Sequence, residues 1–422
     1  MNHSENVDQD AVLRARTMLL GSGGVSAEQR IEAYRVLAEV SPLSYLPKLA
    51  EALVSFGYAA EFRERPDVQL TLYGEAVAVA RRIGAGEPKR TELLCRALTA
   101  YQHQLYASGR RAEGFAICEE MAEAGRQGFE RGQVGSPVYG HGRLAAVLAE
   151  EGRHQEAADI CGQFLRSARA EGVARGAFWH TVEWAAELDA AGRPDEALDA
   201  FAALIDADRG GADTGNTPLA ILTWELVRYS QMLDAAGRRT GAAAARKEAL
   251  DVLAELDRTG ERKDWSNILS WWTMLLGLSG RADEPAASPR APVPPFGSTE
   301  WSHDTRQAYF DALPALEEAT ARLTEAADTD PHGTLPELIA LHRRVTIRTA
   351  LLREKQSHRI LKPLRPVFDK GVALACRLAD LDGESGRSAR ARALTDRSMF
   401  LLAAKQFGEA HEDFAAVATL LD

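Results

Sequence analysis

Apolar residues recur every three to four positions along most of the chain, which is the period of an amphipathic helix. The stretch from Tyr139 to Leu204 shows the pattern twice, as YGHGRLAAVLAEEGRHQEAADICGQF and FWHTVEWAAELDAAGRPDEALDAFAAL. Each copy predicts a helix, a Gly-Arg turn and a second helix. Because long alternating runs of Val, Ile and Thr are absent, we expect almost no β-sheet.

The turn between the two helices of a pair carries Gly-Arg at five places. These are Gly109-Arg110, Gly152-Arg153, Gly192-Arg193, Gly237-Arg238 and Gly280-Arg281, and successive glycines are 40 to 45 residues apart. An earlier pair, beginning at Leu49, has RERP at residues 63–66 instead. Glycine at the turn predicts a left-handed backbone conformation that ends the first helix.

A small residue follows the turn glycine at a fixed distance. Ala157, Ala197 and Ala242 lie five positions after their glycines, and Gly114 takes this place after Gly109. A small side chain here allows a short distance between the two helix axes. One pair cannot bury its apolar face alone, so we expect successive pairs to stack.

With this turn and this alanine, the chain resembles the tetratricopeptide repeat (TPR) family over about residues 49–281, and weakly beyond them. The family's usual period is about 34 residues. The longer period here is similar to the long arrays of kinesin light chain and of the sensor regions in bacterial STAND-type regulators. HEAT and armadillo repeats share the longer period, but the glycine turn and the alanine favour TPR. The resemblance implies an all-α fold, a right-handed superhelical solenoid of antiparallel helix pairs.

The pattern divides the chain into four parts. We expect N-terminal capping helices over 1–48, the repeat array over 49–281, a Pro-rich linker over 282–299, and C-terminal helical repeats with a cap over 300–422. Five prolines between residues 282 and 298 exclude a helix there. That segment is either an exposed linker, which we favour, or an extended segment laid on the solenoid. Beyond it we expect helices over about 303–327, 335–357 and 364–379, then a last pair containing Ala410, Phe414 and Val417.

Composition and charge narrow the class of protein. The 422 residues are 45% hydrophobic and carry a formal net charge of −11, which suits a globular protein and disfavours general nucleic-acid binding. Cys95, Cys118, Cys161 and Cys376 form no C-x-x-C motif, and free thiols fit a reducing cytoplasm. The polar, acidic start MNHSENVDQD and the lack of any apolar run of about eighteen residues argue against a signal peptide and a membrane span. We expect a cytoplasmic protein.

The sequence contains no recognisable catalytic or cofactor signature. H-E-x-x-H, G-x-S-x-G, a P-loop and a Rossmann glycine fingerprint are all absent. GSGG at 21–24 has no preceding strand and no following Lys-Ser/Thr, so we interpret it as a loop that ends a helix. The ten histidines are scattered without metal-ligand spacing. We therefore predict no catalytic residue, no metal and no cofactor, and expect that the protein is not an enzyme.

The resemblance implies that the first helices of the pairs line a concave face on which partners dock. Counting back from the turns places aromatic, cationic and polar side chains on that face. The predicted groove residues are Tyr58, Phe62, Arg96, His103, Tyr106, Tyr139, Trp179, Trp224, Arg228, Gln231 and Trp271. Tyr, Trp and Arg are enriched at binding hot spots. The alternative for each tryptophan is that it packs between long helices as part of the core.

The predicted helix over 335–357 is strongly basic in its middle. Its cationic residues are His342, Arg343, Arg344, Arg348, Arg353 and Lys355. We interpret them as a solvated face paired with acidic residues of neighbouring helices. A site for an anion or an acidic peptide is the alternative, and the overall negative charge disfavours DNA.

Three functions stay open. The leading one is a non-catalytic TPR-type scaffold that binds a protein or a peptide in the groove. The second is a regulatory sensor that binds a small signal, such as a peptide or a nucleotide, and relays it to a partner protein. The third is an accessory protein or enzyme of a biosynthetic pathway, for which His180, Glu183, Asp189 and Arg228 are the candidate polar groups.

Overall fold

A computed structural model describes residues 8–20, 24–170, 177–263, 267–353 and 361–422. Over these residues the regular structure is helical, and the only β-type pairing is an isolated bridge between Ser288 and Ala291. The fold class is all-α, a solenoid-type stack of helix pairs, as the sequence predicts. Of the residues used in the predictions, positions 21–23 of the GSGG loop and Lys355 lie outside the described residues.

The chain forms two compact units, and the first comprises residues 1–147 with the short stretches 166–171 and 302–304. In this unit α3 with α4 and α5 with α6 form successive pairs, packed around fully buried residues such as Leu53, Leu98 and Leu105. Its elements are α1 (Gln9–Leu20), α2 (Ala27–Val40), α3 (Pro42–Gly57), η1 (Ala60–Phe62), α4 (Pro66–Arg81), α5 (Arg90–Ala107) and α6 (Arg111–Glu130). The helices α7 (Gly142–Glu150) and α8 (His154–Ala170) are divided between the units.

The second unit contains the rest of the chain. The pairs α9 with α10 and α11 with α12 continue the pattern of the first unit. The elements are α9 (Ala177–Ala190), α10 (Pro194–Asp213), α11 (Leu219–Ala235), α12 (Arg239–Thr259), α13 (Ile268–Ser279), η3 (Arg281–Asp283), α14 (His303–Asp311), α15 (Leu313–Thr329), α16 (Pro331–Arg353), α17 (Leu361–Leu381), α18 (Gly383–Ala403) and α19 (Phe407–Leu421). The first two residues of α14 belong to the first unit.

Local signals fix where several helices begin. Ser26 caps α2, because its Oγ accepts a hydrogen bond from Gln29 N at 3.1 Å while Gln29 Oε1 accepts one from Ser26 N at 3.0 Å. Pro66 and Pro194 lie in the first turns of α4 and α10, where a backbone N–H has no partner within the helix.

Four of the five Gly-Arg turns have the predicted conformation. Gly109, Gly152, Gly192 and Gly237 have φ between 69° and 79°, and the N–H of the following arginine donates to the carbonyl five residues back at 2.8 to 2.9 Å. This hydrogen bond closes the end of the first helix. The alanines five positions on (Ala157, Ala197, Ala242) are completely buried, as expected for small residues between two packed helices.

The arginine of the turn also has a role that the repeat pattern did not reveal. In three turns its guanidinium makes a bidentate pair with a glutamate three residues later, as Arg193 does with Glu196 at 2.6 and 2.7 Å. The same arrangement joins Arg110 to Glu113 and Arg153 to Glu156. These pairs are largely exposed, so each contributes little stability.

The fifth turn departs from the pattern. Gly280 has φ −91°, and a short 3₁₀ helix follows it instead of the second helix of a pair. Residues 284–301, here called the strap, then run over the second unit. Val293 N donates to Glu150 O at 3.0 Å, Phe296 is 2% exposed, and a Cβ on Gly297 would lie 2.7 Å from Ala186 Cβ. The expected exposed linker is therefore incorrect, and the segment is laid on the helices because its apolar residues are buried there.

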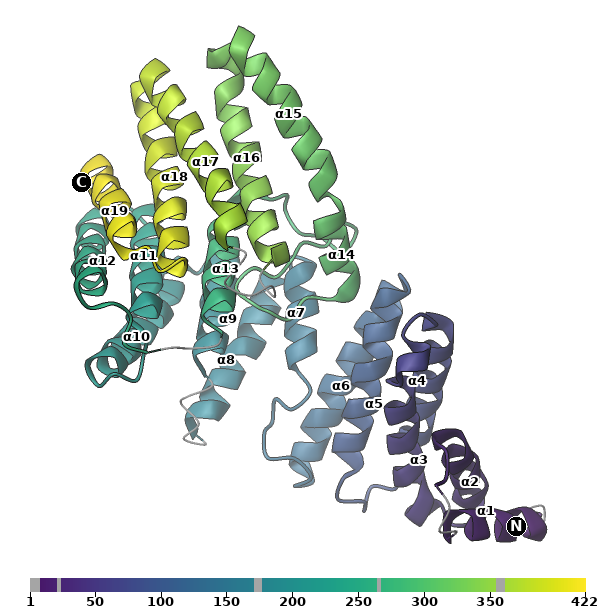
Figure 1. The fold of residues 1–422 in the computed structure, drawn as a ribbon. Coiled ribbons are helices and arrows are strands. Elements are labelled where there is room, and N and C mark those ends of the chain that lie inside the picture. Colours follow the sequence, from purple (N-terminus) through teal and green to yellow (C-terminus); the bar gives the residue numbers. More distant parts are fainter. Residues whose placement is uncertain (1–7, 21–23, 171–176, 264–266, 354–360) are drawn as a thin grey trace. The chain divides into compact units, whose positions relative to one another are not determined.

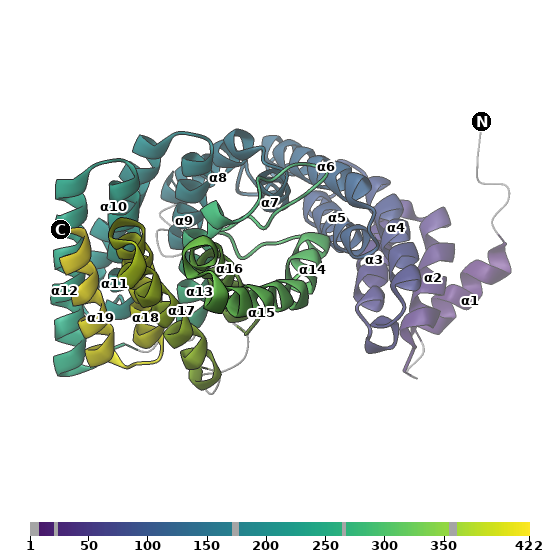
Figure 2. The ribbon, with the colours of Figure 1, turned by 90° about the horizontal axis from the view of Figure 1, so that it is seen from above.

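The last pair, α18 and α19, packs beside α11 and α12 and not only beside its neighbours in sequence. Figures 1 and 2 both show α19 next to α12, and buried residues of both helices belong to one core. Lys405, with φ 59°, takes the place of the turn glycine, and Gln406 N donates to Leu401 O at 2.8 Å. Ala410, five positions after Lys405, is completely buried. The repeat therefore resumes here with a lysine in the left-handed conformation.

One predicted helix is in fact two. The expected helix over 303–327 breaks at Ala312 into α14 and α15. Pro314 explains the break, because proline lacks an N–H and its ring clashes with the carbonyl four residues back. Among the described helices, none combines the length and the apolar character needed to cross a bilayer.

Candidate functional site

Six of the predicted groove residues lie in the first unit, and three of them are exposed. Tyr58 is 62% exposed where α3 ends, and Arg96 and His103 are exposed on α5. Arg96 Nη1 lies 3.1 Å from Glu51 Oε1 of α3, so the two helices share this face. These three positions match a surface of first helices.

The other three residues of the first unit are covered. Phe62 and Tyr106 are 7% and 1% exposed, and Tyr139 is partly buried. The Phe62 ring meets Phe56 edge-on at 4.8 Å, and the Tyr106 ring fills the space above Gly114. Phe62 and Tyr106 are therefore core side chains, which corrects their assignment to a groove surface.

The groove residues predicted for the second unit lie mostly beneath other helices. Trp224 and Trp271 are 2% and 0% exposed. Trp224 Nε1 donates to Met399 O of α18 at 3.1 Å, and Trp271 packs against the partly buried Trp179 with ring centroids 4.9 Å apart. Trp224 and Trp271 are core residues, because α18 and α9 cover the faces on which they lie.

Arg228 and Gln231 lie with Trp224 on a cavity of only about 30 Å³ between α11, α13 and α18. This volume holds about one water molecule and no peptide side chain. Burial lowers the pKa of Arg228 to about 10, and its Nε has no hydrogen-bond partner in the described part of the chain. Arg228 and Gln231 are therefore partly buried side chains that line a small cavity, which has no room for a peptide side chain.

The polar groups of the enzyme alternative are only partly brought together. His180 Nδ1 and Glu183 Oε2 lie 3.4 Å apart, Asp189 is exposed, and Arg228 lines the small cavity between α11, α13 and α18. Over the described ranges, no three side chains of His, Cys, Asp or Glu gather where a metal ion would be held.

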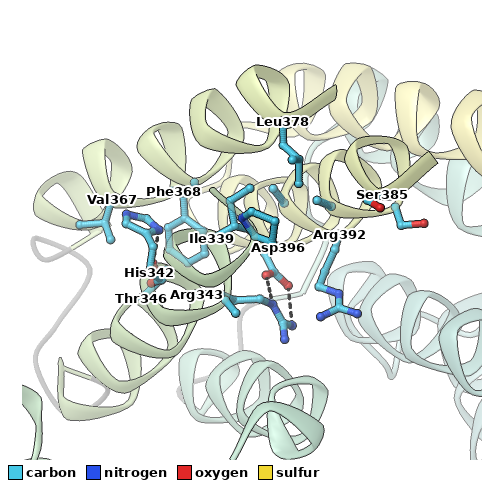
Figure 3. Close-up of a pocket in the computed structure, with 16 residues that line it drawn as sticks. Ile339, His342, Arg343, Thr346, Val367, Phe368, Leu378, Ser385, Arg392 and Asp396 are labelled. Atoms are coloured by element: carbon cyan, nitrogen blue, oxygen red, sulfur yellow. Dashed lines mark hydrogen bonds and ion pairs between the residues drawn. The ribbon is translucent and has the colours of Figure 1, made fainter. Parts of the chain in front are cut away.

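A larger cavity, which the sequence did not predict, lies between α16, α17 and α18 (Figure 3). We call it the α16–α18 pocket, and its volume is about 250 Å³. Most of its wall is apolar, formed by Ile339, Ala340, Val367, Phe368, Leu378, Ala389 and Ala393. The polar side chains are His342, Arg343, Thr346, Ser385, Ser388, Arg392 and Asp396.

The Arg343 guanidinium is fixed by partners on every side. Its Nε donates to Asp396 Oδ2 at 2.6 Å, its Nη1 to Asp283 Oδ2 at 2.5 Å, and its Nη2 to Ser279 Oγ at 2.8 Å. Burial would lower the pKa of Arg343, but the two carboxylates outweigh burial and raise it. Figure 3 shows Arg343 and Asp396 facing each other in the pocket wall.

The Arg392 side chain is more exposed and more weakly paired than that of Arg343. Its side chain is 58% exposed, and its single ion pair among the described residues joins Nη1 to Asp283 Oδ1 at the long distance of 3.4 Å. Asp283 is already paired with Arg343. Arg392 is therefore the cation of the pocket that can turn toward a bound anionic group at little cost.

His342 is a neutral group in the same wall. It is 6% exposed, and burial, with Lys370 adding to the effect, lowers its pKa to about 4. Thr346 Oγ1 donates to the His342 carbonyl at 2.8 Å, so the 3.4 Å contact of this hydroxyl with Nδ1 requires the ring N–H to be the donor. Nε2 is then the ring atom able to accept a hydrogen bond.

The basic middle of α16 is paired, as expected, but it is not solvated. Arg344 Nη2 and Arg348 Nη2 both lie 2.8 Å from Glu284 Oε2 of the strap, and the Arg348 side chain is 6% exposed. Arg348 also lies over the Tyr309 ring, 4.0 Å from its centroid. The interpretation as a solvated face is thus wrong for His342, Arg343 and Arg348, because α17, α18 and the strap respectively cover them. The acidic pair Asp283-Glu284 after α13 was the sequence signal for this arrangement.

Comparisons with known proteins add little to the geometry. No model of a known protein family matches the chain, and no curated protein matches it. Solved structures that resemble it include BtubC (BKLC) from P. vanneervenii, 18% identical over 57% of this chain and 91% of that one, with a TM-score of 0.39. A circular tandem repeat protein with novel repeat topology and enhanced subunit contact surfaces is 16% identical over 98% of this chain and 87% of that one, with a TM-score of 0.16. Similarity at these scores carries no argument about function.

Proposed function

We propose that this chain is a non-catalytic receptor that binds a small, largely apolar molecule in the α16–α18 pocket and relays its presence to a partner protein. One observation carries the proposal: three consecutive helices line a mostly apolar cavity of about 250 Å³ with several polar groups in its wall. Such a cavity is the usual form of a small-molecule site. It favours the sensor among the three functions considered.

The wall chemistry defines the ligand class. The apolar side chains suit an aliphatic or aromatic body, and Arg392 suits an anionic group at its end. His342 Nε2 accepts a hydrogen bond from an O–H or N–H of the ligand. A nucleotide fits poorly, because its phosphates need several cations and Arg343 is already fully paired.

A route for the relay exists within the second unit. Arg343 joins the pocket wall to Ser279 and Asp283 at the end of α13, and Glu284 next to them holds Arg344 and Arg348. A ligand that moves α16 would therefore also move the end of α13 and the start of the strap. A largely buried network of ion pairs has few intermediate arrangements, which suits a two-state response.

We further propose that the helix pairs are of the TPR class. Support comes from the left-handed glycine turn and the buried alanine five residues later, which recur in the structure at Gly152, Gly192 and Gly237. The TPR class is a matter of architecture and leaves the ligand open.

Binding of 1-anilinonaphthalene-8-sulfonate, which joins an aromatic body to an anion, tests the pocket. We expect saturable fluorescence enhancement with the wild type and about tenfold weaker binding by Ala389→Phe, whose ring fills the cavity. Ala373→Phe is the matched control, since it places the same ring on the exposed side of α17. Arg392→Gln should weaken binding severalfold. Equal binding by the two phenylalanine variants, both folded by circular dichroism, would refute the assignment.

A second function, docking of a peptide or protein on the first unit, is favoured by the exposed face of α3 and α5. Tyr58, Arg96 and His103 line this face. A crosslinking pull-down that compares the wild type with Tyr58→Ala and Arg96→Glu tests it. Arg82→Glu, an exposed change at the C-cap of α4, is the control. A partner that both variants lose and the control keeps supports docking on this face. Capture of the same partners by the wild type and all three variants excludes it.

A further inference from the structure

A second cavity, separate from the α16–α18 pocket, lies beneath the strap. Its volume is about 190 Å³, and its walls come from α13, the strap, α14 and α16. Phe296, Trp301 and Phe310 supply aromatic surface, Met274 and Leu351 supply aliphatic surface, and Arg306 is the one charged side chain in the wall. At the volume of liquid water the cavity holds about six molecules, so a ligand with a single ring fits.

Arg306 is held by aromatic rings instead of by a carboxylate. Its guanidinium carbon lies 5.6 Å from the Trp301 ring centroid and 5.2 Å from that of Phe310. Within the described ranges Arg306 makes no hydrogen bond and no ion pair, whereas Arg343, Arg344 and Arg348 on neighbouring α16 are each paired with a carboxylate. The cation–π contacts position the guanidinium but leave its N–H donors for a ligand.

The rings that hold Arg306 are themselves fixed. Trp301 Nε1 donates to Ser298 O at 2.9 Å, and the Trp301 and Phe310 rings are stacked at 6.1 Å with an interplanar angle of 18°. Phe296, 2% exposed, meets Trp301 edge-on at 6.1 Å. The strap therefore builds a preorganised wall, in which binding orders few side chains.

Hydroxyl groups complete the polar part of the cavity. Ser270 of α13 and Thr299 of the strap both line it, and Thr299 is exposed at its rim. Neither hydroxyl makes a hydrogen bond within the described part of the chain. Together with Arg306 they offer donors to an anion, with the aromatic wall beside them.

We infer that this cavity binds an aromatic monocarboxylate, with its ring against Phe296 and Trp301 and its carboxylate on the Arg306 guanidinium. One guanidinium matches one carboxylate in charge and in bidentate geometry. A phosphate would leave a second negative charge without a cation. A cationic ligand is excluded because the positive charge of Arg306 would repel it. This inference does not rest on the proposed function of the α16–α18 pocket.

Isothermal titration of the full chain with benzoate tests the inference. We expect benzoate to bind, benzyl alcohol and phenyl phosphate to bind at least about tenfold more weakly, and Arg306→Gln to weaken benzoate by about tenfold or more, which corresponds to about 1.4 kcal/mol. Arg306→Lys, which keeps the charge but not the bidentate geometry, should fall between. Arg290→Gln, an exposed arginine of the same strap, is the matched control and should bind like the wild type.

Several results would overturn the inference. These are no benzoate binding at tens of millimolar, equal affinity for benzoate and benzyl alcohol, tighter binding of phenyl phosphate, and unchanged benzoate binding by a folded Arg306→Gln. If Arg306→Gln fails to fold, Arg306→Lys decides, since unchanged affinity in that variant excludes a bidentate pair. The α16–α18 pocket variant Ala389→Phe should retain benzoate binding, which separates the two sites.

Discussion

At the scale of single residues, the sequence identified many important aromatic side chains but misjudged their environment. Trp224 lies on a first helix, as the repeat count predicts, yet α18 covers it from about 175 positions further along the chain. No local pattern reports such a distant cover. The exposed Tyr58, by contrast, meets Tyr73 of the next helix, α4, and still leaves 62% of its surface exposed.

We therefore predict that Trp224→Ala is a stability variant and not a binding variant. Removing a completely enclosed indole and its hydrogen bond to Met399 O should lower the free energy of unfolding by about 3–5 kcal/mol. Tyr58→Ala, an exposed aromatic truncation, should change it by less than about 0.5 kcal/mol. Urea denaturation followed by circular dichroism measures both. A small loss for Trp224→Ala would mean that α18 does not cover it.

His342 should make stability depend on pH below neutrality. Its folded pKa of about 4 lies below the unfolded value of about 6.5, so the unfolded chain binds the proton first. The stabilisation of the folded state that comes from neutral His342 is on the order of 3 kcal/mol. It is fully present above about pH 6.5 and is lost as the pH falls toward 4. His342→Gln should remove that part of the slope between pH 7 and 5. The assignment would be wrong if the free energy of unfolding fell by the same amount between pH 7 and pH 5 in His342→Gln and in the wild type.

At the scale of elements, the turn is the feature that sequence and structure describe in the same way. Five similar turns have the left-handed residue, the hydrogen bond to the carbonyl five residues back, and a buried alanine or glycine after it. The turn could be predicted from the sequence because all of its parts lie within about fifteen residues. The buried position of the strap could not be predicted, because the strap lies on a surface formed by α7, α9 and α13. These helices belong to three different pairs.

The two kinds of turn residue give a matched pair of predictions. Gly192→Ala should lower the free energy of unfolding by about 1 kcal/mol. Gly192 has φ 76° and open space where a Cβ would lie, so the whole loss comes from backbone strain. Lys405→Gly should raise the free energy of unfolding by roughly 0.5–1 kcal/mol, because glycine adopts the φ of 59° without strain. Thermal unfolding in the same buffer compares them. A loss with Lys405→Gly would show that the lysine side chain's own contacts outweigh the strain.

At the scale of the whole molecule, the sequence predicted the all-α class and most helices but not the order in which helices stack within the second unit. A repeat read from sequence implies that each pair touches the next pair in the chain. Here Gly280 starts a 3₁₀ turn, the strap leaves the array, and α18 with α19 returns to α11 and α12. Both candidate ligand cavities lie outside the regular array of pairs, since each is bounded by at least one helix that follows the strap. Their residues were visible in the sequence, but their grouping was not.

Truncation tests that stacking order. A chain ending at Asp382 lacks α18 and α19, so Trp224 and the adjoining face of α12 lose their cover. Amide hydrogen exchange in α11 and α12 should then accelerate at least roughly tenfold, because local opening would cost less free energy. Removal of residues 1–41, which takes α1 and α2 from the first unit, should leave exchange in α11 and α12 unchanged. If the pairs stacked only in chain order, the C-terminal truncation would also leave α11 and α12 protected, so the comparison of the two truncations separates a returning C-terminal pair from a simple linear array.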